Sequence, residues 1–381
     1  MQDWIKIWMI IVEFAALSYL LIMSIINFGW HNTKTFIPSK LNKFEKVSVV
    51  IAVRNEAQKI RKLLESLLNQ TYPRELFELV IINDNSDDDT VSIIEEFGRN
   101  QLDFNIVLIN SEGEGKKNAL LTGMKQIKNE IIITTDGDCE ISSPDWIMNY
   151  ASFFDKSSAH LVFGPVMYKK SESFLKRIFS LEFASLVSSG AGSSGVGLTL
   201  MGNGANLAFK KSSYETVKNK MGGSDFASGD DVFLMHSIAS NFGKSAVKFI
   251  KSKESLVETD APDTFNKFIN QRLRWGSKAK AYTNLWPILV SLTVFVFSFV
   301  LVTTALLSFY ESWFLAVYVL FILLKFLLDY PIIKGFMKYF HRNNSALLLL
   351  VLEFVYPFYI LYTALAAIFI PFGWKGRKKI K

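Results

Sequence analysis

The sequence is poor in the residues that form disulfides and zinc sites. Cys139 is the only cysteine among 381 residues, so no disulfide can form within the chain, which agrees with a reducing cytoplasm. The four histidines are scattered and lack the ligand spacing of a zinc site; they are His31, His160, His236 and His341. These absences exclude a disulfide-stabilised fold and argue against zinc chemistry.

Long apolar runs are missing from the middle of the chain and concentrated at its two ends. Half of the residues are hydrophobic and the mean hydropathy is +0.23, high for a soluble protein. Residues 4–28 are apolar apart from five positions and would extend about 37 Å as a helix, enough to span a bilayer. A signal peptide is the alternative, but the run is too long and Lys6 alone charges its start. We predict a retained anchor over residues 1–30.

Three further apolar segments follow near the other end, at residues 285–309, 313–333 and 346–372. Glu353 and Pro357 interrupt the last of them. Three such runs in about ninety residues do not fit helices in a soluble core. We therefore predict an integral protein of the cell membrane, with a C-terminal membrane segment over 285–372 and a basic tail over 373–381.

The basic residues beside these segments suggest an orientation. Lysines 34, 40, 43 and 46 follow the first span, which by the positive-inside rule puts a domain at 46–282 in the cytoplasm. The loop 334–342 then also lies in the cytoplasm, but three full C-terminal crossings would leave the basic tail outside. Either the rule fails at the tail, or residues 346–372 re-enter at Pro357 instead of crossing; the sequence leaves both open.

The net charge of +7 points to a partner of opposite sign. Nucleic acid is the usual partner of a basic protein, but here lysine and arginine gather beside the apolar segments. Anionic lipid headgroups explain that placement better. We expect membrane lipids as partners and no nucleic acid.

The stretch Ile131–Glu140, IIITTDGDCE, is the centre of the predicted domain. Its β-branched residues predict a buried strand, which runs into Asp136-Gly137-Asp138. Because side chains alternate along a strand, both carboxylates can point the same way, and Gly137 leaves room for a bulky ligand. Such a pair suits Mg²⁺ or Mn²⁺ carrying a diphosphate, although Asp-Gly is also common in turns.

Three more strands are predicted at Val47–Val53, Leu79–Ile82 and Asn105–Ile109, with helical patterns between them. This alternation predicts an α/β fold with a mostly parallel sheet and ligands at the carboxyl ends of its strands. Asp84 follows the second strand and could accept from a nucleotide base, or belong to a capped turn. Lys116 opens a helix, where it could meet a diphosphate or form a solvated ion pair.

Later motifs carry further candidates. The glycine-rich stretch 190–204 predicts a mobile or close-packed loop lining a site, and Pro144 is expected at the first position of a helix. Asp231, after Asp230, is either a helix cap or a general base. In Gln271-Arg272-Leu273-Arg274-Trp275, arginine offers a planar fork for phosphate and tryptophan an apolar face for a sugar; a membrane-interface anchor is the competing interpretation.

Together these motifs resemble a membrane-bound family 2 glycosyltransferase with the A-type nucleotide-diphospho-sugar transferase fold. The resemblance runs from about Val47 to Trp275 and continues into the flanking spans. Its parts occur in the family's order: Arg54-Asn55-Glu56, the Asp84 region, Gly115-Lys116, Asp136-x-Asp138, Gly204-x-Asn206, Asp230-Asp231 and Gln271-x-x-Arg274-Trp275. Two positions depart from the pattern, Asp230 where many members carry glutamate and Asn85 where glycine is usual.

The resemblance implies a role for each matching residue. The donor, UDP-linked by default, would be bound by Ala52, Glu56, Asp84, Lys116, Asp136 and Asp138, and Asp138 with Asp136 would hold Mg²⁺ or Mn²⁺ on its diphosphate. Asp231, beside Asp230, would deprotonate the acceptor hydroxyl for an inverting attack. Acceptor and diphosphate would meet Gly204, Asn206, Gln271, Arg274 and Trp275.

The acceptor stays open between three hypotheses. The small C-terminal membrane segment favours transfer to a membrane lipid or a polyprenyl-linked intermediate. The second hypothesis is a processive synthase that extends and exports a polysaccharide, since Gln-x-x-Arg-Trp is shared with such synthases, but an export channel usually needs more helices than one chain offers here. The third is a non-catalytic membrane scaffold, against which the intact acidic residues 136, 138 and 231 speak.

Overall fold

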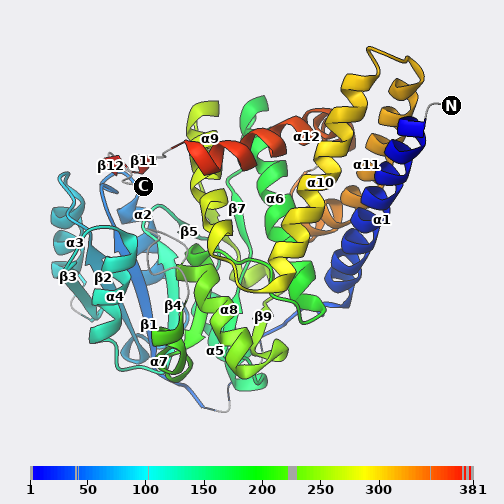
Figure 1. Ribbon diagram of the computed structural model, residues 1–381. Helices are drawn as coiled ribbons and strands as arrows, with labels where there is room; N and C mark the ends of the chain where they lie inside the picture. The colour runs from blue at the N-terminus through cyan, green and yellow to red at the C-terminus, as the bar shows by residue number, and fades with distance from the viewer. Residues whose placement is uncertain are drawn as a thin grey trace. The chain divides into compact units, whose positions relative to one another are not determined.

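The computed structural model describes residues 3–38, 41, 43–101, 103–221, 230–343, 345–370, 373–374 and 377–378. The chain forms two compact units (Figure 1). The first, here called the helical unit, comprises Met1–Asn32, Lys170–Leu200 and Pro262–Lys381. The second, the sheet unit, comprises Thr33–Lys169 and Met201–Ala261.

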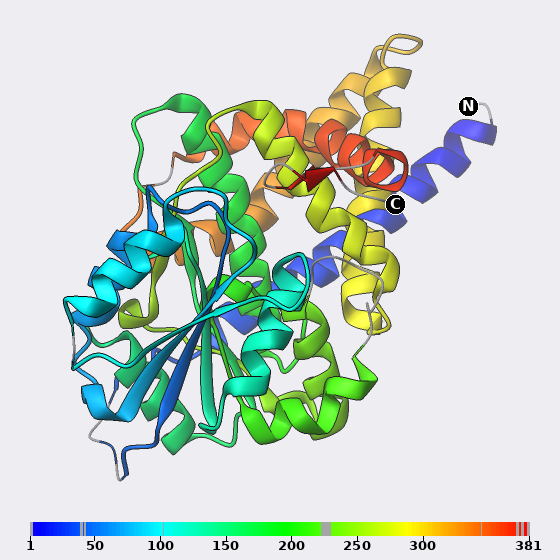
Figure 2. The same cartoon turned by 90° about the vertical axis from the view of Figure 1, so that its left-hand side faces the viewer.

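The sheet unit is built on a seven-stranded mixed sheet in the order β3-β2-β1-β4-β8-β6-β9 (Figure 2). Its strands are β1 (Val47–Val53), β2 (Phe77–Asn83), β3 (Ile106–Asn110), β4 (Ile131–Asp136), β6 (Leu161–Phe163), β8 (Leu207–Lys210) and β9 (Val247–Phe249). The first four of the order run parallel, and β8 is antiparallel to both of its neighbours. Nearly every residue of β1 and β4 is buried, as expected of central strands covered on both faces.

Helices and a small second sheet complete this unit. The helices are α2 (Ile60–Leu68), α3 (Thr90–Arg99), α4 (Lys116–Gln126), α5 (Trp146–Lys156), α7 (Lys211–Val217) and α8 (Asp230–Phe242). Short 3₁₀ turns lie at Arg74–Leu76, Gly204–Asn206 (η2), Lys218–Lys220, Lys244–Ala246 and Lys253–Ser255. The second sheet has the order β5-β10-β7, with β5 (Glu140–Ile141), β10 (Val257–Thr259) and β7 (Val166–Tyr168).

The predicted strands and helices of this unit are confirmed to within a few residues, with one error at α5. Pro144 was expected as its first helical residue, but the helix begins at Trp146. The carbonyl of Pro144 instead accepts from the backbone N–H of Thr71 at 2.8 Å. This bond fixes the segment before α5 to the end of α2, so the helix starts later.

The helical unit contains six helices among its described residues. They are α1 (Asp3–Asn32), α6 (Phe174–Gly195), α9 (Phe265–Gly276), α10 (Leu285–Leu307), α11 (Trp313–Tyr339) and α12 (Ala346–Phe369). A 3₁₀ turn spans Ser277–Ala281, and β11 (Gly373–Trp374) pairs with β12 (Arg377–Lys378). Helices α1, α10, α11 and α12 are long and apolar enough to cross a membrane. The predicted domain 46–282 draws on both units, and its bounds stay a prediction.

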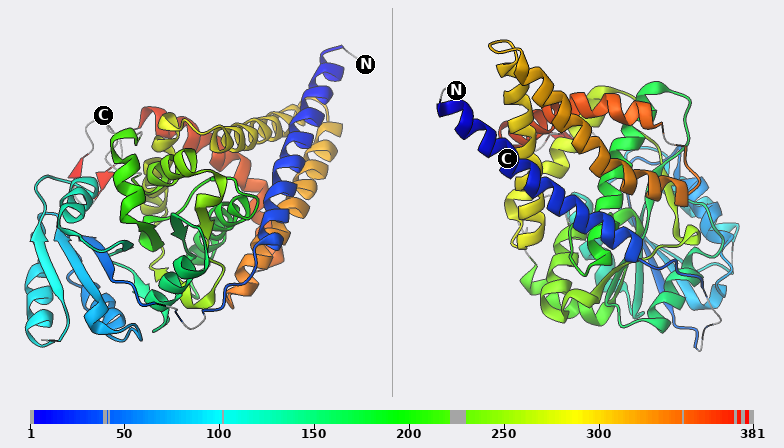
Figure 3. Two further views of the ribbon diagram at one scale, coloured as in Figure 1. Left: turned by 90° about the horizontal axis from the view of Figure 1, so that it is seen from below. Right: turned by 90° about the vertical axis from the view of Figure 1, so that its right-hand side faces the viewer.

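Helices α1 and α11 run side by side in the same direction (Figure 3). At one end the ring of Trp4 lies 6.3 Å from that of Phe314, and at the other the ring of Trp30 lies 5.5 Å from that of Phe336. We call the end with Trp4 and Phe314 the outer end of the bundle and the end with Trp30 and Phe336 the inner end. Because α10 is joined to the outer end of α11 by a short turn, α10 runs from the inner to the outer end.

The glycine-rich stretch is not a loop over its first part, and that prediction was wrong. Helix α6 continues to Gly195, and a Cβ at Gly192 would fall on the carbonyl oxygen of Ile26 in α1. Small residues let two helix backbones approach closely. The glycines at 190, 192 and 195 therefore belong to a helix, and Gly192 serves its contact with α1.

A buried cluster of charges joins three helices of this unit. Lys325 of α11 lies 2.6 Å from a carboxylate oxygen of Asp329, one turn further along, and also pairs with Glu353 of α12. The hydroxyl of Tyr19 in α1 donates to Asp329 at 2.7 Å. Charges inside apolar helices are stable only when paired in this way.

Candidate active site

The predicted donor residues gather at the carboxyl end of the parallel strands. In the register of the sheet, Ala52 of β1 lies between Ile82 of β2 and Asp136 of β4. Asp84 follows directly after β2, and its backbone N–H donates to the carbonyl of Val53 at 2.8 Å. Three candidates from distant parts of the sequence, Ala52, Asp84 and Asp136, thus share one edge of the sheet.

Asp84 is buried, with 1% of its surface exposed, and organises this edge. One carboxylate oxygen accepts from the backbone N–H of Gly115 at 2.9 Å, and its carbonyl accepts from the Arg54 guanidinium at 2.8 Å. Gly115 has a φ of +92°, a conformation that favours glycine. Two motifs that are thirty residues apart, Arg54 and Asp84, are therefore joined to the start of α4.

Lys116, the first residue of α4, forms an ion pair with Asp136. Both side chains are about one-third exposed or less. The contact brings a cationic and an anionic candidate side by side. A diphosphate could bind to the lysine there, and a cation could bind to the carboxylate.

Asp138 lies in the turn that follows β4, and the glycine before it has a different purpose from the one predicted. A Cβ at Gly137 would lie 2.9 Å from a methyl of Val53 and 3.2 Å from the Cγ of Glu56. The space beside Gly137 is filled by β1 and its following loop, so it offers no room for a ligand. The glycine is required because the turn packs tightly against Val53. Glu56 itself is buried, and its backbone N–H donates to Thr90 at 2.7 Å.

Lys59 is a charged neighbour of this edge that sequence reasoning missed. Its ammonium lies 3.0 Å from Asp260. Partial burial lowers the pKa of Lys59, but the carboxylates of Asp260, Asp138 and Glu56 outweigh it, so the pKa lies above its usual value. The site thus holds a second cation near Asp138. No local pattern around Lys59 indicates this pair, because Asp260 lies two hundred residues further along the chain.

The donor set fits a divalent cation that shares its shell with a substrate. Among the described residues, no group of three or more histidine, cysteine or acidic side chains could enclose a metal ion. Asp136 and Asp138 are hard oxygen donors, and Mg²⁺ is usually held by one or two carboxylates together with substrate phosphates and water. Two carboxylates at an open strand end match that type of site better than a closed structural one.

Burial also keeps the neighbouring Cys139 in its neutral form. Desolvation raises the pKa of its thiol, and the charges of Asp138 and Asp136 raise it further. A protonated thiol is a poor metal ligand, so Cys139 does not add to the donor set.

Asp231, the predicted base, is held by backbone groups at the start of α8. One of its carboxylate oxygens accepts from the N–H of Gly204 at 2.9 Å, and the other from the N–H of Val232 at 2.9 Å. The carbonyl of Gly204 in turn accepts from the hydroxyl of Thr134 in β4 at 2.7 Å. Asp231 and Gly204 are thus brought together beside β4. The backbone of Asp230 begins α8, but its side chain lies outside the described residues.

Asn206 is a buried residue that hydrogen-bonds several neighbouring segments. Its side chain is fully buried, and its amide oxygen accepts from Trp146 at 3.0 Å and Tyr150 at 2.7 Å. Its amide nitrogen donates to the carbonyls of Pro165 and Ser255 at 2.8 and 2.7 Å. These bonds use the full capacity of an asparagine side chain. The geometry therefore favours a structural role for Asn206, which fixes the 3₁₀ turn η2 and the position of Gly204 within it.

Gln271, Arg274 and Trp275 belong to α9 of the helical unit, and Arg272 contacts two of them, Gln271 and Trp275. This arginine is buried and forms an ion pair with Glu182 of α6. Its guanidinium also donates to the side-chain oxygen of Gln271 at 2.5 Å and lies 4.4 Å from the ring centroid of Trp275. Sequence reasoning passed over Arg272, because it separates the recognised positions and its partner is ninety residues away.

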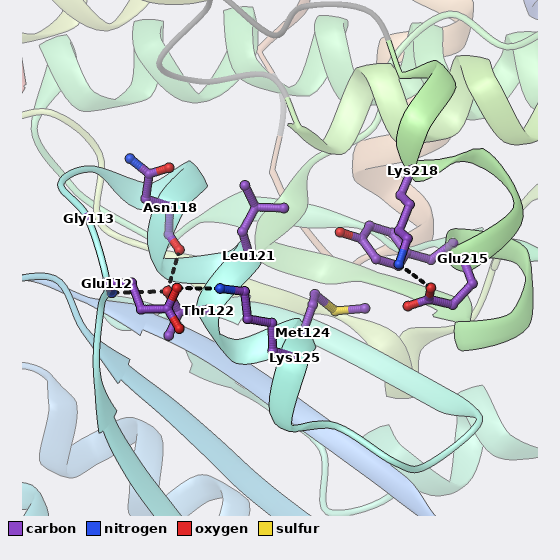
Figure 4. Close-up of a pocket in the computed structure, with 10 residues that line it drawn as sticks. Glu112, Gly113, Asn118, Leu121, Thr122, Met124, Lys125, Glu215 and Lys218 are labelled. Carbon is purple, nitrogen blue, oxygen red and sulfur yellow. Dashed lines mark hydrogen bonds and ion pairs between the residues drawn. The ribbon is translucent and has the colours of Figure 1, made fainter.

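A separate hollow in the sheet unit lies between α4 and α7 and has a volume of about 570 Å³ (Figure 4). None of the predicted site residues line it. Its two lysines point to carboxylates of the same wall, Lys125 to Glu112 and Lys218 to Glu215. With these charges paired, the hollow gives no indication of a ligand.

Comparison with known proteins relates the chain to glycosyltransferases. The model of the family "Glycosyl transferase family 2" matches residues 48–217. Poly-β-1,6-N-acetyl-D-glucosamine synthase of Staphylococcus epidermidis is 25% identical over 343 residues, which cover 86% of this chain and 78% of that protein. Glycosyltransferase AglE of Haloferax volcanii is 34% identical over 122 residues, 32% of this chain and 40% of that protein.

One solved structure is similar over almost the whole chain. The mannosyltransferase PcManGT from Pyrobaculum calidifontis, determined with GDP-Man and Mn²⁺, aligns with a TM-score of 0.63 at 18% identity and covers 96% of this chain and 97% of that one. At this identity the likeness speaks for the fold, and it confirms the expected A-type architecture. Residues 48–217 match glycosyltransferase family 2, and the chain is a glycosyltransferase with an A-type fold and apolar helices at both ends.

Proposed function

We propose that this protein is an inverting, metal-dependent transferase that moves a sugar from a nucleotide-diphospho-sugar to a membrane lipid or lipid-linked acceptor. The observation that carries the proposal is the convergence of Asp84, Lys116 and Asp136 at one strand end. This edge combines a buried hydrogen-bond acceptor, a cation and a carboxylate. The acceptor can bind a nucleotide base, the cation a diphosphate, and the carboxylate a divalent metal ion.

The donor nucleotide lies along the edge formed by Ala52, Glu56 and Asp84. Ala52 is small, and its partly exposed side chain leaves the end of β1 open. The Asp84 carboxylate is fixed by Gly115, and a carboxylate oxygen has more than one acceptor position. When the donor binds, the ion pair between Lys116 and Asp136 breaks, and Lys116 binds the diphosphate instead.

Asp136 and Asp138 would hold Mg²⁺ or Mn²⁺, which when bound neutralises the charge that develops on the departing diphosphate. The protein's own part is to present both carboxylates at a fixed turn. Gly137 allows this turn to pack on β1, so both carboxylates stay next to the strand end. Lys59 adds positive charge beside Asp138 and would assist the same leaving group.

Asp231 takes the proton of the acceptor hydroxyl. The N–H groups of Gly204 and Val232 each occupy one position on its two oxygens, which fixes the carboxylate while leaving lone pairs for a proton. Gln271, Arg274 and Trp275 complete the proposal as residues for diphosphate and acceptor. That part rests on the motif, because these side chains belong to the other unit.

The apolar helices support an acceptor that is itself bound to the membrane. By the positive-inside rule, the lysines that follow α1 support a cytoplasmic sheet unit. A second candidate function has its own support: the Staphylococcus epidermidis relative, similar over 86% of this chain, is named as the synthase of a polysaccharide. On that alternative the product would be a β-linked polymer that the protein also exports.

Transfer from labelled donors into isolated membranes tests the proposal. Membranes with the wild-type chain and with Asp231→Asn receive a panel of UDP-sugars and GDP-mannose, with Mn²⁺, Mg²⁺ or a chelator, and are then extracted with solvent. We expect a small labelled product in the organic phase that depends on the cation and on Asp231. Label in a long aqueous chain that glycosidases digest would favour the synthase. No turnover of any donor in the presence of cation would contradict transferase activity.

A further inference from the structure

Two loops at neighbouring strand ends of the sheet unit are joined by hydrogen bonds. The first loop, residues 54–57, follows β1, and the second loop, residues 84–90, follows β2 and ends with the first residue of α3. The backbone N–H of Asn55 donates to the hydroxyl of Ser86 at 3.2 Å, and the side-chain oxygen of Asn55 accepts from the N–H of Asp87 at 3.0 Å. These bonds hold the two loops side by side at the edge proposed for the nucleotide.

Both loops contain an asparagine in the left-handed region of backbone conformation. Asn55 and Asn85 each have a φ of +53°, which is unfavourable for residues with a side chain, although asparagine tolerates it better than most. Such conformations persist where neighbouring contacts hold them, and they cluster at active sites and ligand clamps. The bonds of Asn55 to the second loop are contacts of this kind. The two loops therefore have a defined shape.

Asp88 joins the second loop to the first through both of its carboxylate oxygens. One oxygen accepts from the backbone N–H of Ala57 at 3.1 Å. The other accepts from the hydroxyl and the backbone N–H of Thr90, at 2.5 and 3.1 Å. Burial raises the pKa of Asp88, but these hydrogen bonds outweigh it and hold the pKa below its usual value. The carboxylate is therefore ionised at neutral pH, and its hydrogen bonds are charge-assisted.

Thr90 connects Asp88 to Glu56. Its side chain is fully buried, and its hydroxyl, which donates to Asp88, accepts from the backbone N–H of Glu56 at 2.7 Å. A hydroxyl has one hydrogen to donate, so the carboxylate of Asp88 sets the direction of the Thr90 hydroxyl and leaves its lone pairs for Glu56. Two successive N–H groups of the first loop, those of Glu56 and Ala57, are thus held by the second loop.

Glu56 lies against the turn that carries the two metal-binding candidates. Its side chain is buried, with 7% exposed, and its Cγ would be 3.2 Å from a Cβ at Gly137. A shift of the first loop would therefore disturb the turn 136–138. Arg54 of the same loop donates to the carbonyl of Asp84 at 2.8 Å. The shape of the first loop thus affects both the nucleotide edge and the carboxylates proposed for the cation.

We propose that Asp88 is a positioning residue for donor binding, which acts through Thr90 and Ala57 to hold the first loop in the shape that binds the donor. A loop already in this shape has less freedom to lose when the ligand binds. The proposal rests on the proposed function, because it takes Glu56 and Asp84 as donor residues. A simpler role for Asp88 is that of a helix cap, since Thr90 is the first residue of α3; a cap alone would stabilise α3 without an effect on the donor.

Nucleotide binding to the full chain in detergent tests the proposal. UDP, GDP, ADP and dTDP are titrated calorimetrically with Mn²⁺ into wild type, Asp88→Asn and the matched control Asp89→Asn. The control removes the same charge at the next position, where the side chain makes no capping hydrogen bond. Asparagine at position 88 turns an amide N–H₂ towards a group that the carboxylate accepted from. If the first loop then keeps its binding shape in about one molecule in ten, the apparent Kd rises about tenfold; Asp89→Asn should bind like wild type.

Thr90 offers a conservative pair of variants. Thr90→Ser keeps the hydroxyl and should bind nucleotide like wild type, whereas Thr90→Val removes it and should raise the Kd as Asp88→Asn does. Because both changes break the link through one hydroxyl, the double variant should lose much less affinity than the product of the two single effects.

Steady-state transfer adds a readout that a helix cap would not change. Saturating donor holds the loop by itself, so the KM for the donor should rise about as much as the Kd while kcat stays near the wild-type value. Equal Kd values for Asp88→Asn and Asp89→Asn would overturn the inference, as would a lower unfolding temperature of Asp88→Asn with unchanged Kd and KM. A wild-type chain that binds none of the nucleotides would overturn the proposed donor site as well, so the two failures are distinguishable.

Discussion

Replacement of Glu182 by glutamine should damage α9 and its motif from a distance. Glu182 and Arg272 are 10% and 4% exposed at their side chains, and the guanidinium meets the carboxylate through two of its nitrogens. Removing one partner of a buried ion pair typically costs about 3–5 kcal/mol, because the other charge stays buried and unpaired. Glutamine keeps one acceptor oxygen, so we expect about 3 kcal/mol, the lower end of that range.

The same change should lower activity more than it lowers donor affinity. Arg272 joins Glu182 to Gln271 by a hydrogen bond and to Trp275 by a cation–π contact. When the carboxylate is lost, these two motif side chains lose their anchor, and a shift of about 1 Å at a positioning residue can cost 10²-fold in rate. Arg272→Lys should lower activity too, because a lysine ammonium lacks the planar fork that contacts both the Glu182 carboxylate and the Gln271 amide.

Thermal unfolding in detergent and steady-state transfer measure both effects. A matched control is Asp263→Asn, which breaks the exposed pairs with Lys176 and Lys267 near the same helix and should change stability by less than about 1 kcal/mol. Tyr359→Phe removes only the hydroxyl that donates to Glu182 and should cost about 1 kcal/mol. If Glu182→Gln is as stable and as active as the Asp263 control, Arg272 does not position the motif.

Four further changes have defined outcomes. Asp231→Asn should keep donor binding and lose about 10²–10⁴ in transfer rate. Chelation of divalent cations should abolish transfer, and Mn²⁺ or Mg²⁺ should restore it. Gly137→Ala should destabilise the sheet unit by about 1–3 kcal/mol, because its Cβ would lie 2.9 Å from Val53. The Lys59–Asp260 pair should stabilise the fold between about pH 4 and pH 10, and Asp260→Asn should remove that contribution.

The sign of the pH effect follows from the two partners. Burial raises the pKa of Asp260, but Lys59 and Lys169 outweigh it and hold the pKa below its usual value, so the stabilisation is lost as pH falls through that value. The pKa of Lys59 is raised, so the stabilisation persists below its ordinary pKa and is lost as pH rises further. Unfolding midpoints of wild type and Asp260→Asn should converge in strong acid; a constant difference at every pH would contradict the pairing.

Each of the other three changes has its own check. Isothermal titration of Asp231→Asn with the donor separates binding from transfer, and transfer at the wild-type rate would remove the base assignment. Activity that persists in excess chelator would rule out a required cation. For Gly137→Ala, the matched control is Gly98→Ala, where a Cβ would lie 3.9 Å from a methyl of Ile106; equal stability of the two variants would refute the tight packing on Val53.

The strands were predictable because their pattern is local. Runs such as VSVVIAV at Val47–Val53 are apolar throughout, and only a strand covered on both faces needs that. The order of motifs then placed Asp84, Lys116 and Asp136 at one edge, and the pairing of Lys116 with Asp136 agrees with it. Here residue type and position along a strand were sufficient.

What could not be predicted depends on contacts between distant segments. Nothing near Arg272 in the sequence indicates Glu182, and nothing near Lys59 indicates Asp260. The glycines at 190–195 predict a loop, because glycine lowers helix propensity by about 1 kcal/mol. Close packing of Gly192 on Ile26 outweighs that cost, and only the tertiary structure shows it.

The charges between α11 and α12 bear on how the protein is made. Lys325 and Asp329 are one turn apart on the same helix, so α11 carries its own counter-ion when it leaves the ribosome and enters the bilayer. Glu353 has no such partner within α12 and meets Lys325 only after α11 is in place. Synthesis from the N-terminus therefore delivers the helices in the order in which their charges can be neutralised, and α12 docks last.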